Sequence, residues 1–127
     1  MPKEIIFSEN APKVIGAYSQ AVKAGNLVFL SGQIALDPVS GSKVMGGVET
    51  QTKRIMENLK VVAEAAGGSM DNIVKTTVYL KRIDDFKFVN VVYEKYFTGN
   101  YPARATVGVS DLPRGVDVEI DAIMFLD

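Results

Sequence analysis

The sequence predicts a single α+β domain, residues 1–127, in which two helices pack on one face of a mixed β-sheet. The 127 residues are 47% hydrophobic and 23% charged, which is the composition of one globular domain with its own core. Apolar residues recur with strand and helix periods in the order strands, helix, strand, helix, strands, which favours an α+β or α/β sandwich. The chain carries no internal repeat and no linker, so we expect one structural unit.

The first third of the chain predicts strands separated by short turns. Residues 5–7 form a candidate edge strand, and residues 16–24 form a second extended segment that ends at the Gly25-Asn26 turn. Residues 27–34 predict a strand with apolar side chains on both faces, which is typical of a strand that is covered on both sides. The segment from Asp37 to Gly41 is rich in turn-forming residues and predicts a loop.

Two segments have helical periodicity. Residues 48–66 carry apolar residues close to the 3.6 period, and Gly67-Gly68 predicts a left-handed cap that ends this helix. A second helix is expected to begin with Asp84 or Asp85 as its N-cap and to end before Thr98. Its predicted apolar stripe comprises Phe86, Val89, Val92, Tyr93, Tyr96 and Phe97.

Three further segments predict strands. Residues 73–80 are rich in β-formers, with Val74, Thr76, Val78 and Leu80 on one face. Residues 103–109 place small apolar residues on one face and Arg104, Thr106, Gly108 and Ser110 on the other. Residues 116–126 form a long final strand with Asp117, Glu119 and Asp121 on one side.

The predicted sheet has one face that two helices cannot cover. Leu27, Phe29, Tyr79, Ile123 and Phe125 all place apolar groups on that second face. A large exposed apolar face is rare on a soluble monomer, so the sequence predicts that a partner subunit covers it.

The composition excludes several classes of function. A net charge of −1 and a pI near 5.5 make nucleic acid and anionic membranes poor partners. The chain has no Cys and no His, so thiol nucleophiles, catalytic triads and most transition-metal sites lack their usual residues. No apolar run is long enough for a secretory signal or a membrane span, and we expect a soluble, cytoplasmic protein that holds no metal.

Arg104 is the first candidate site residue. It follows a Tyr-Pro-Ala entry into a strand, and the other residues on its face are small or carry hydroxyl groups. A guanidinium in such a recess is suited to bidentate capture of a carboxylate, which Lys cannot reproduce. The alternative is a solvated Arg that pairs with a nearby acid.

Glu119 is the second candidate. If its face of the final strand is covered, burial and the neighbouring acids would raise the pKa of one carboxyl, as a base that works near neutral pH requires. The alternative is a charged face that is open to water. Tyr18, Ser31 and Asn90 are weaker candidates for a site wall, because such groups often only satisfy a backbone partner.

Several phrases in this order resemble one family. They are Ala11-Pro12 with Ile15 to Ala21, Leu30 to Ile34, Gln51 to Leu59, Val74 to Leu80, Val89-Asn90 with Tyr93-Glu94, Tyr101 to Arg104, and Val118 to Ile120. No single phrase is specific, but together they span nearly the whole chain. The chain is similar to the Rid family of reactive-intermediate deaminases, in its RidA, YjgF-like branch.

The resemblance implies a chorismate-mutase-like fold and a homotrimer with an active site in each cleft between subunits. It further implies hydrolysis of enamines and imines, such as 2-aminoacrylate, to 2-oxo acids and ammonia without a cofactor. By the same resemblance, Arg104 would bind the substrate carboxylate and Glu119 would activate water. Tyr18, Ser31, Gly32, Asn90 and Thr106 would line the pocket and contact the substrate.

One position departs from the family pattern. Many relatives carry a Cys two residues after the arginine, where this chain has Thr106, so a thiol is absent and the hydroxyl can only form hydrogen bonds.

Two other functions remain open. A trimer that binds small carboxylates or 2-oxo acids without turnover would need Arg104 but not Glu119, and RNA cleavage is disfavoured by the acidic pI and the absence of His.

Overall fold

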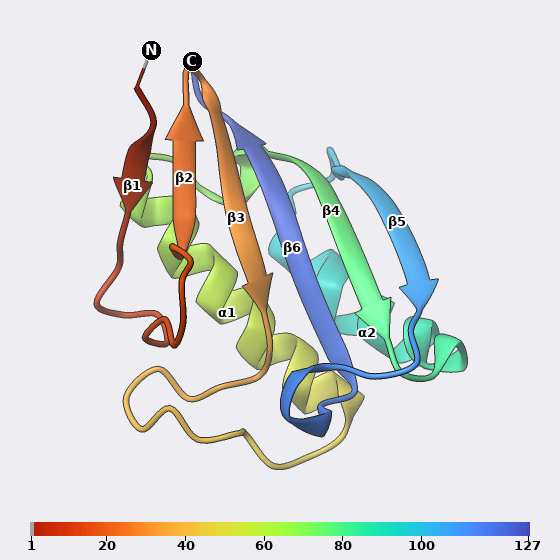
Figure 1. Cartoon of the computed structure of the whole chain (residues 1–127). Coiled ribbons are helices and arrows are strands. Elements are labelled where there is room, and N and C mark those ends of the chain that lie inside the picture. The colour runs from red at the N-terminus through yellow and green to blue at the C-terminus, as the bar shows by residue number, and fades with distance from the viewer. Residues whose placement is uncertain (1) are drawn as a thin grey trace.

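The computed structural model describes residues 2–127 and contains one six-stranded mixed sheet with two α-helices behind it (Figure 1). The strands are β1 (Glu4–Ile6), β2 (Ala21–Ala24), β3 (Leu27–Gln33), β4 (Ile73–Leu80), β5 (Ala103–Gly108) and β6 (Val118–Phe125). Their order in the sheet is β1-β2-β3-β6-β4-β5. All neighbours are antiparallel except β4 and β5, which are parallel and are joined through the second helix. The predicted α+β class and the mixed sheet are confirmed.

Both helices lie on the same face of the sheet, as predicted. The first is α1 (Val48–Ala65), and Gly67, with a φ of 99°, follows it in the left-handed conformation expected of a cap. The second is α2 (Phe86–Tyr93), which packs beside α1 (Figure 1). Alternate residues of the central strands point towards these helices and are almost fully buried: Val28, Leu30, Val78, Leu80, Val118, Ile120 and Met124. This layer is the core that fixes the positions of β4 and β6.

The opposite face of the sheet is apolar and open. Its side chains align across four strands, where Ile5 pairs with Val22, Val22 with Phe29, and Phe29 with Ile123. Ile5 is 54% exposed and Phe29 is 44% exposed in the single chain. The predicted apolar second face is therefore present, and we call it the open face.

Two strand predictions were wrong in detail. Residues 16–20 form no strand. They belong to the loop before β2, in which Gly16 has a φ of 123°, and only Ala21–Ala24 form the strand. Val74 does not share the buried face of Thr76, since a register irregularity between Ile73 and Lys75 leaves Val74 46% exposed.

The second helix is shorter than predicted. A 3-10 turn (Ile83–Asp85) precedes α2 and another (Glu94–Tyr96) follows it. Neither Asp84 nor Asp85 caps it through its side chain, because Asp85 already has helical backbone angles. Phe86, predicted in the apolar stripe, is 46% exposed.

The acidic run near the end of the chain does not lie on one side. Asp117 precedes β6, and its carboxylate accepts a hydrogen bond from Gln51 Nε2 on α1 at 2.9 Å. The Gln51 side-chain oxygen accepts in return from the backbone N–H of Asp117 at 3.1 Å. Asp117 thus ties the entrance of β6 to the helix layer, whereas Glu119 and Asp121 lie on the open face.

Candidate active site

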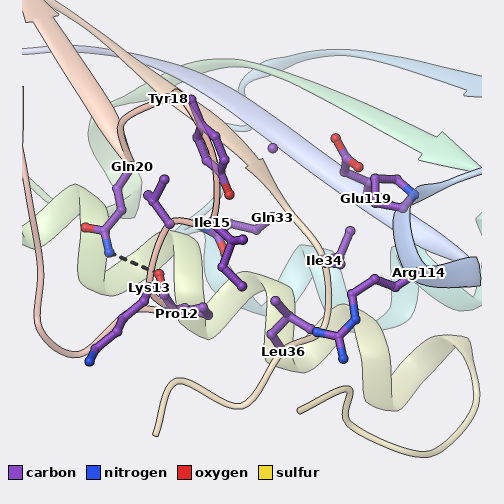
Figure 2. Close-up of a pocket in the computed structure, with 13 residues that line it drawn as sticks. Pro12, Lys13, Ile15, Tyr18, Gln20, Gln33, Ile34, Leu36, Arg114 and Glu119 are labelled. Carbon is purple, nitrogen blue, oxygen red and sulfur yellow. Dashed lines mark hydrogen bonds between the residues drawn. The ribbon is translucent and has the colours of Figure 1, made fainter. Parts of the chain in front are cut away.

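Glu119 lies at the wall of a cavity of about 450 Å³ at one end of the sheet (Figure 2). The cavity is formed by the loop before β2, the end of β3, and the turn that leads into β6. Its lining is largely apolar, with contributions from Pro12, Val14, Ile15, Ile34, Leu36 and Pro113. Tyr18, Gly32 and Arg114 also line it, so the predicted residues Tyr18, Gly32 and Glu119 share one space.

The Glu119 carboxylate lies directly over Gly32. A Cβ atom at Gly32 would overlap the Glu119 Oε2 atom and would lie 3.0 Å from Cδ. Only glycine leaves room for the carboxylate in this place. Gly32 therefore contributes its bare backbone to the floor of the site.

The pKa of the Glu119 carboxyl differs from its ordinary value. Burial raises the pKa of Glu119 above its ordinary value, and the negative charge of Asp121 adds to the increase. Within residues 2–127, no side chain donates a hydrogen bond to this carboxylate, and no Lys or Arg holds it by charge. The carboxylate is therefore half-buried, free to accept a proton, and open to the cavity.

A buried glutamine positions the loop that carries Tyr18. Gln20 is 3% exposed, and its amide nitrogen donates to the carbonyls of Ser8 and Pro12, each at 3.1 Å. Its amide oxygen accepts from the backbone N–H of Ser8 at 2.6 Å. The loop is thus fixed against the sheet, and Tyr18, itself 54% exposed, stands at the wall of the cavity (Figure 2).

Arg104 lies elsewhere, on the edge strand β5. Its Nη1 atom donates to Asn90 Oδ1 of α2 at 2.6 Å, and its guanidinium carbon lies 5.0 Å from the centre of the Tyr93 ring. The Tyr93 hydroxyl is 2.7 Å from Thr76 Oγ1, so the ring that supports the guanidinium is itself fixed. A second cavity of about 400 Å³ opens here, lined by Asn90, Tyr93, Glu94, Tyr101, Pro102 and Arg104.

Arg104 and Glu119 lie on opposite faces of the sheet. Arg104 pairs across the ladder with Thr76, which is buried beneath the helices. Glu119 pairs with Tyr79, three residues further along the same strand and on the other face. The single chain therefore contains two half-sites, which we name the Glu119 half-site and the Arg104 half-site after the cavities described above.

The remaining predicted residues divide unevenly between the half-sites. Asn90 belongs to the Arg104 half-site, as the hydrogen bond shows. Ser31 uses its hydroxyl to donate to the Ser19 carbonyl at 2.6 Å, so it braces the Tyr18 loop and does not line the cavity. Thr106 lies two residues beyond Arg104 on β5 and lines neither cavity.

Sequence reasoning missed several residues of these sites. Tyr93 was predicted as core, and it is buried, but it also supports the Arg104 guanidinium. Arg114 has a left-handed backbone, with a φ of 58°, and its Nη1 atom donates to the Gly41 carbonyl at 3.0 Å. Its place before Gly115 in a turn was a usable signal, because strained backbone is frequent at functional sites.

No helix within residues 2–127 is long and apolar enough to cross a membrane. No three His, Cys, Asp or Glu side chains in this range come together in a way that could hold a metal ion.

Comparison with known proteins identifies the family. A family model described as Endoribonuclease L-PSP matches residues 8–125. A RutC family protein of Pyrococcus horikoshii is 52% identical over 123 residues, covering 97% of this chain and 98% of its own. The 2-iminobutanoate/2-iminopropanoate deaminase of Rattus norvegicus is 48% identical over 121 residues, covering 95% of this chain and 88% of its own. The crystal structure of RidA from an Antarctic Psychrobacter superposes with a TM-score of 0.93 at 41% identity, covering 97% and 99% of the two chains. These matches span almost the whole chain and agree with the resemblance of its motifs, so the chain belongs to the Rid (YjgF, L-PSP) family.

Proposed function

We propose that the protein hydrolyses enamine and imine intermediates, such as 2-aminoacrylate, to 2-oxo acids and ammonia. The observation that carries this proposal is the Glu119 carboxylate, half-buried over Gly32 in a largely apolar cavity and without a hydrogen-bond donor among residues 2–127 of its own chain. Such a group can accept a proton from water. The rat relative's name as an imine deaminase supports the same chemistry.

Arg104 is the proposed carboxylate ligand. Asn90 and Tyr93 hold its guanidinium in place, and only one of its five N–H donors is used in this hydrogen bond. A fork held in this way can bind a 2-imino acid by both carboxylate oxygens. Tyr101 and Pro102 line the space beside it.

Hydrolysis then requires one water and one base. The reacting form is the iminium ion, which an imine reaches by protonation on nitrogen and an enamine by protonation on its terminal carbon. The water oxygen attacks the iminium carbon as Glu119 takes one water proton, and the C=N double bond becomes the single bond of a neutral carbinolamine. Glu119 passes this proton to the amine nitrogen, and the C–N bond then breaks with release of ammonia while the hydroxyl proton returns to Glu119 as the C=O bond of the 2-oxo acid forms. Glu119 finally loses this proton to the released ammonia or to solvent. A positioned general base of this kind typically contributes about 10²–10⁴-fold in rate.

The two half-sites must come from different copies of the chain. A small substrate cannot contact both faces of one sheet, so Arg104 of one subunit would face Glu119 of its neighbour. The open face supplies the apolar surface for such contact. We infer a homotrimer with three shared sites, in agreement with the family resemblance.

Mixing two inactive variants tests the shared site. Arg104→Ala and Glu119→Gln are each expected to lose most activity as pure proteins. When they are unfolded together and refolded as mixed assemblies, sites that combine the intact Glu119 of one chain with the intact Arg104 of the other are restored. Random mixing should recover about a quarter of the parent activity.

The assay follows ammonia and 2-oxo acid release from 2-aminoacrylate generated in situ. Mixing without unfolding is the control for simple addition of residual activities. Absence of recovery, with mixed assemblies verified by mass, would show that the sites are not shared. Absence of turnover in the parent would remove the deaminase proposal itself.

A second candidate is a trimer that binds small carboxylates without turnover. The separation of the half-sites favours this binder in one respect: the Arg104 half-site has the groups that bind a carboxylate without any contribution from the Glu119 half-site. Calorimetry with 2-oxobutanoate distinguishes the two. Binding that Arg104→Ala removes, in a parent that converts no imine, would support the binder.

RNA cleavage is named in the family description but has less support in this chain. The two cavities are not lined by a run of basic residues, and the protein has a net charge of −1. A ribonuclease needs a basic track to hold the phosphate backbone. Incubation with labelled RNA is the direct check.

A further inference from the structure

Two acids lie next to each other on the open face of β6. Glu119 and Asp121 are two residues apart in the strand and so point to the same side. On β4, Tyr79 is the residue opposite Glu119, and Thr77 is opposite Asp121. The Tyr79 side chain reaches diagonally across this ladder, and its hydroxyl donates a hydrogen bond to Asp121 Oδ2 at 3.0 Å.

This hydrogen bond makes the two acids unequal. Asp121 receives a donor, whereas Glu119 receives none from residues 2–127. The hydrogen bond from Tyr79 therefore fixes the Asp121 carboxylate on the open face, whereas the Glu119 carboxylate stays free to exchange a proton. When two neighbouring acids interact, the charge on the first opposes ionisation of the second.

We propose that Tyr79 and Asp121 are positioning residues for Glu119: the phenol holds the Asp121 carboxylate beside Glu119, and the charge of this carboxylate makes Glu119 the acid of the pair that exchanges a proton with the reaction. The inference rests on the proposed function, in which Glu119 is the base. The pKa of Glu119 is raised first by burial and then by Asp121, in agreement with the geometry. Burial and the bond to Asp121 also raise the pKa of Tyr79, so the phenol keeps its proton at neutral pH.

Within residues 2–127 of one chain, the other charged groups around the cavity do not take over this role. The loop before β2 contributes Lys13 and Tyr18 to the cavity, and the turn before β6 contributes Arg114. In Figure 2 the charged ends of Lys13 and Arg114 point away from Glu119. From β3, the backbone of Gly32 lies against the carboxylate.

The chain offers a matched control for the charge of Asp121. Asp117 is also two residues from Glu119, on the other side in sequence, but its carboxylate binds Gln51 in the helix layer. Asp121→Asn and Asp117→Asn therefore remove the same charge at the same sequence separation. Only the first removes it from the face that Glu119 occupies.

The decisive measurement is the titration of the Glu119 side-chain carboxyl by carbon NMR in the assembled protein. In Asp121→Asn we expect Glu119 to titrate at lower pH than in the parent, whereas Asp117→Asn should leave its titration unchanged. Tyr79→Phe should shift it in the same direction by a smaller step, since Asp121 keeps its carboxyl but loses its donor. Asp121→Glu should restore the parent behaviour in part.

The kinetic readout is the acid limb of the pH profile of kcat/KM for imine hydrolysis. This limb should move by the same amount as the Glu119 titration in each variant. A Glu119 titration that is unchanged in Asp121→Asn, or one that moves equally in Asp117→Asn, overturns the proposal. Should Asp121→Asn fail to fold, Tyr79→Phe carries the same test. The NMR titration needs no turnover, so it decides this inference even if the parent proves unable to hydrolyse imines.

Discussion

At the scale of single residues, the candidate site depends on two contacts: the close approach of Glu119 to Gly32 and the packing of Arg104 on Tyr93. The close approach is Glu119 over Gly32, which places a carboxylate against bare backbone. The support is Tyr93 beneath Arg104, which fixes a long, flexible side chain before any ligand arrives. Arg104 and Glu119 were predictable from their residue types and their places in strands, but these two supporting contacts were not, because both depend on packing between elements distant in sequence.

Glu119→Gln is expected to stabilise the protein at neutral pH while it removes activity. The folded-state pKa of Glu119 is raised, so the folded state binds more protons than the unfolded state in the range above the unfolded value of about 4.3. Stability contributed by this group is therefore lost as pH rises through the folded pKa. The variant, which has no such group, should unfold at a higher temperature than the parent near about pH 8, and the difference should vanish below about pH 4. Thermal unfolding of both proteins at the two pH values is the measurement, and an equal difference at both would contradict the argument.

Gly32→Ala is expected to reduce activity with little loss of stability. The new methyl group would meet only the end of the Glu119 side chain, which can rotate away and so leave its catalytic place. We expect a fall in kcat of about 10²-fold, near the lower limit for loss of a general base. Gly47→Ala, where a Cβ meets nothing within 4 Å, is the control. A fully active Gly32→Ala protein would show that Glu119 need not lie there.

At the scale of elements, the loops that carry the site are held by side-chain amides. Gln20 ties the Tyr18 loop to Ser8 and Pro12, and Gln51 ties the entrance of β6 to α1. Helix and strand order followed from apolar periodicity, and the open face followed from the apolar alternation of residues 27–34. Residues 16–20 do not continue β2: Gly16 has a φ of 123°, which a strand does not adopt, and the Gln20 side chain binds the backbone of Ser8 and Pro12 earlier in the same loop. Nothing in the sequence of residues 73–80 indicates the bulge at Val74, because β-branched residues occupy positions on both faces of this strand.

Gln20→Met is expected to destabilise the chain by about 1–3 kcal/mol, because it leaves buried backbone groups of Ser8 and Pro12 without partners. The released loop should also raise KM more than it lowers kcat, since Tyr18 lines the cavity while Glu119 stays in the sheet. Urea unfolding and steady-state kinetics measure the two effects. Lys23→Met, three residues further along, is the control and should change stability little. An unchanged midpoint in Gln20→Met would contradict the proposed role of the amide.

At the scale of the whole molecule, the open face is the main unexplained surface of the single chain. Phe29→Asp places a charge in the middle of its apolar row and is expected to shift the protein from the proposed trimer towards the 13.8 kDa chain, with loss of activity. Light scattering coupled to gel filtration measures the mass. Val39→Asp, at a loop position that is 96% exposed, is the control for added charge. A parent that already has the mass of one chain would contradict the assembly.

Placing the two half-sites on opposite faces of one sheet has a consequence for stoichiometry. In the proposed assembly, each chain contributes one Arg104 half-site and one Glu119 half-site. A head-to-tail pair of chains therefore joins one half-site of each kind and leaves the other two unpaired. Such a pair holds one complete site for two chains, whereas a closed ring of any size holds one site per chain. Activity per chain should therefore be twice as high in the closed assembly as in a covalently trapped open pair. Closure of the ring forms the last complete site.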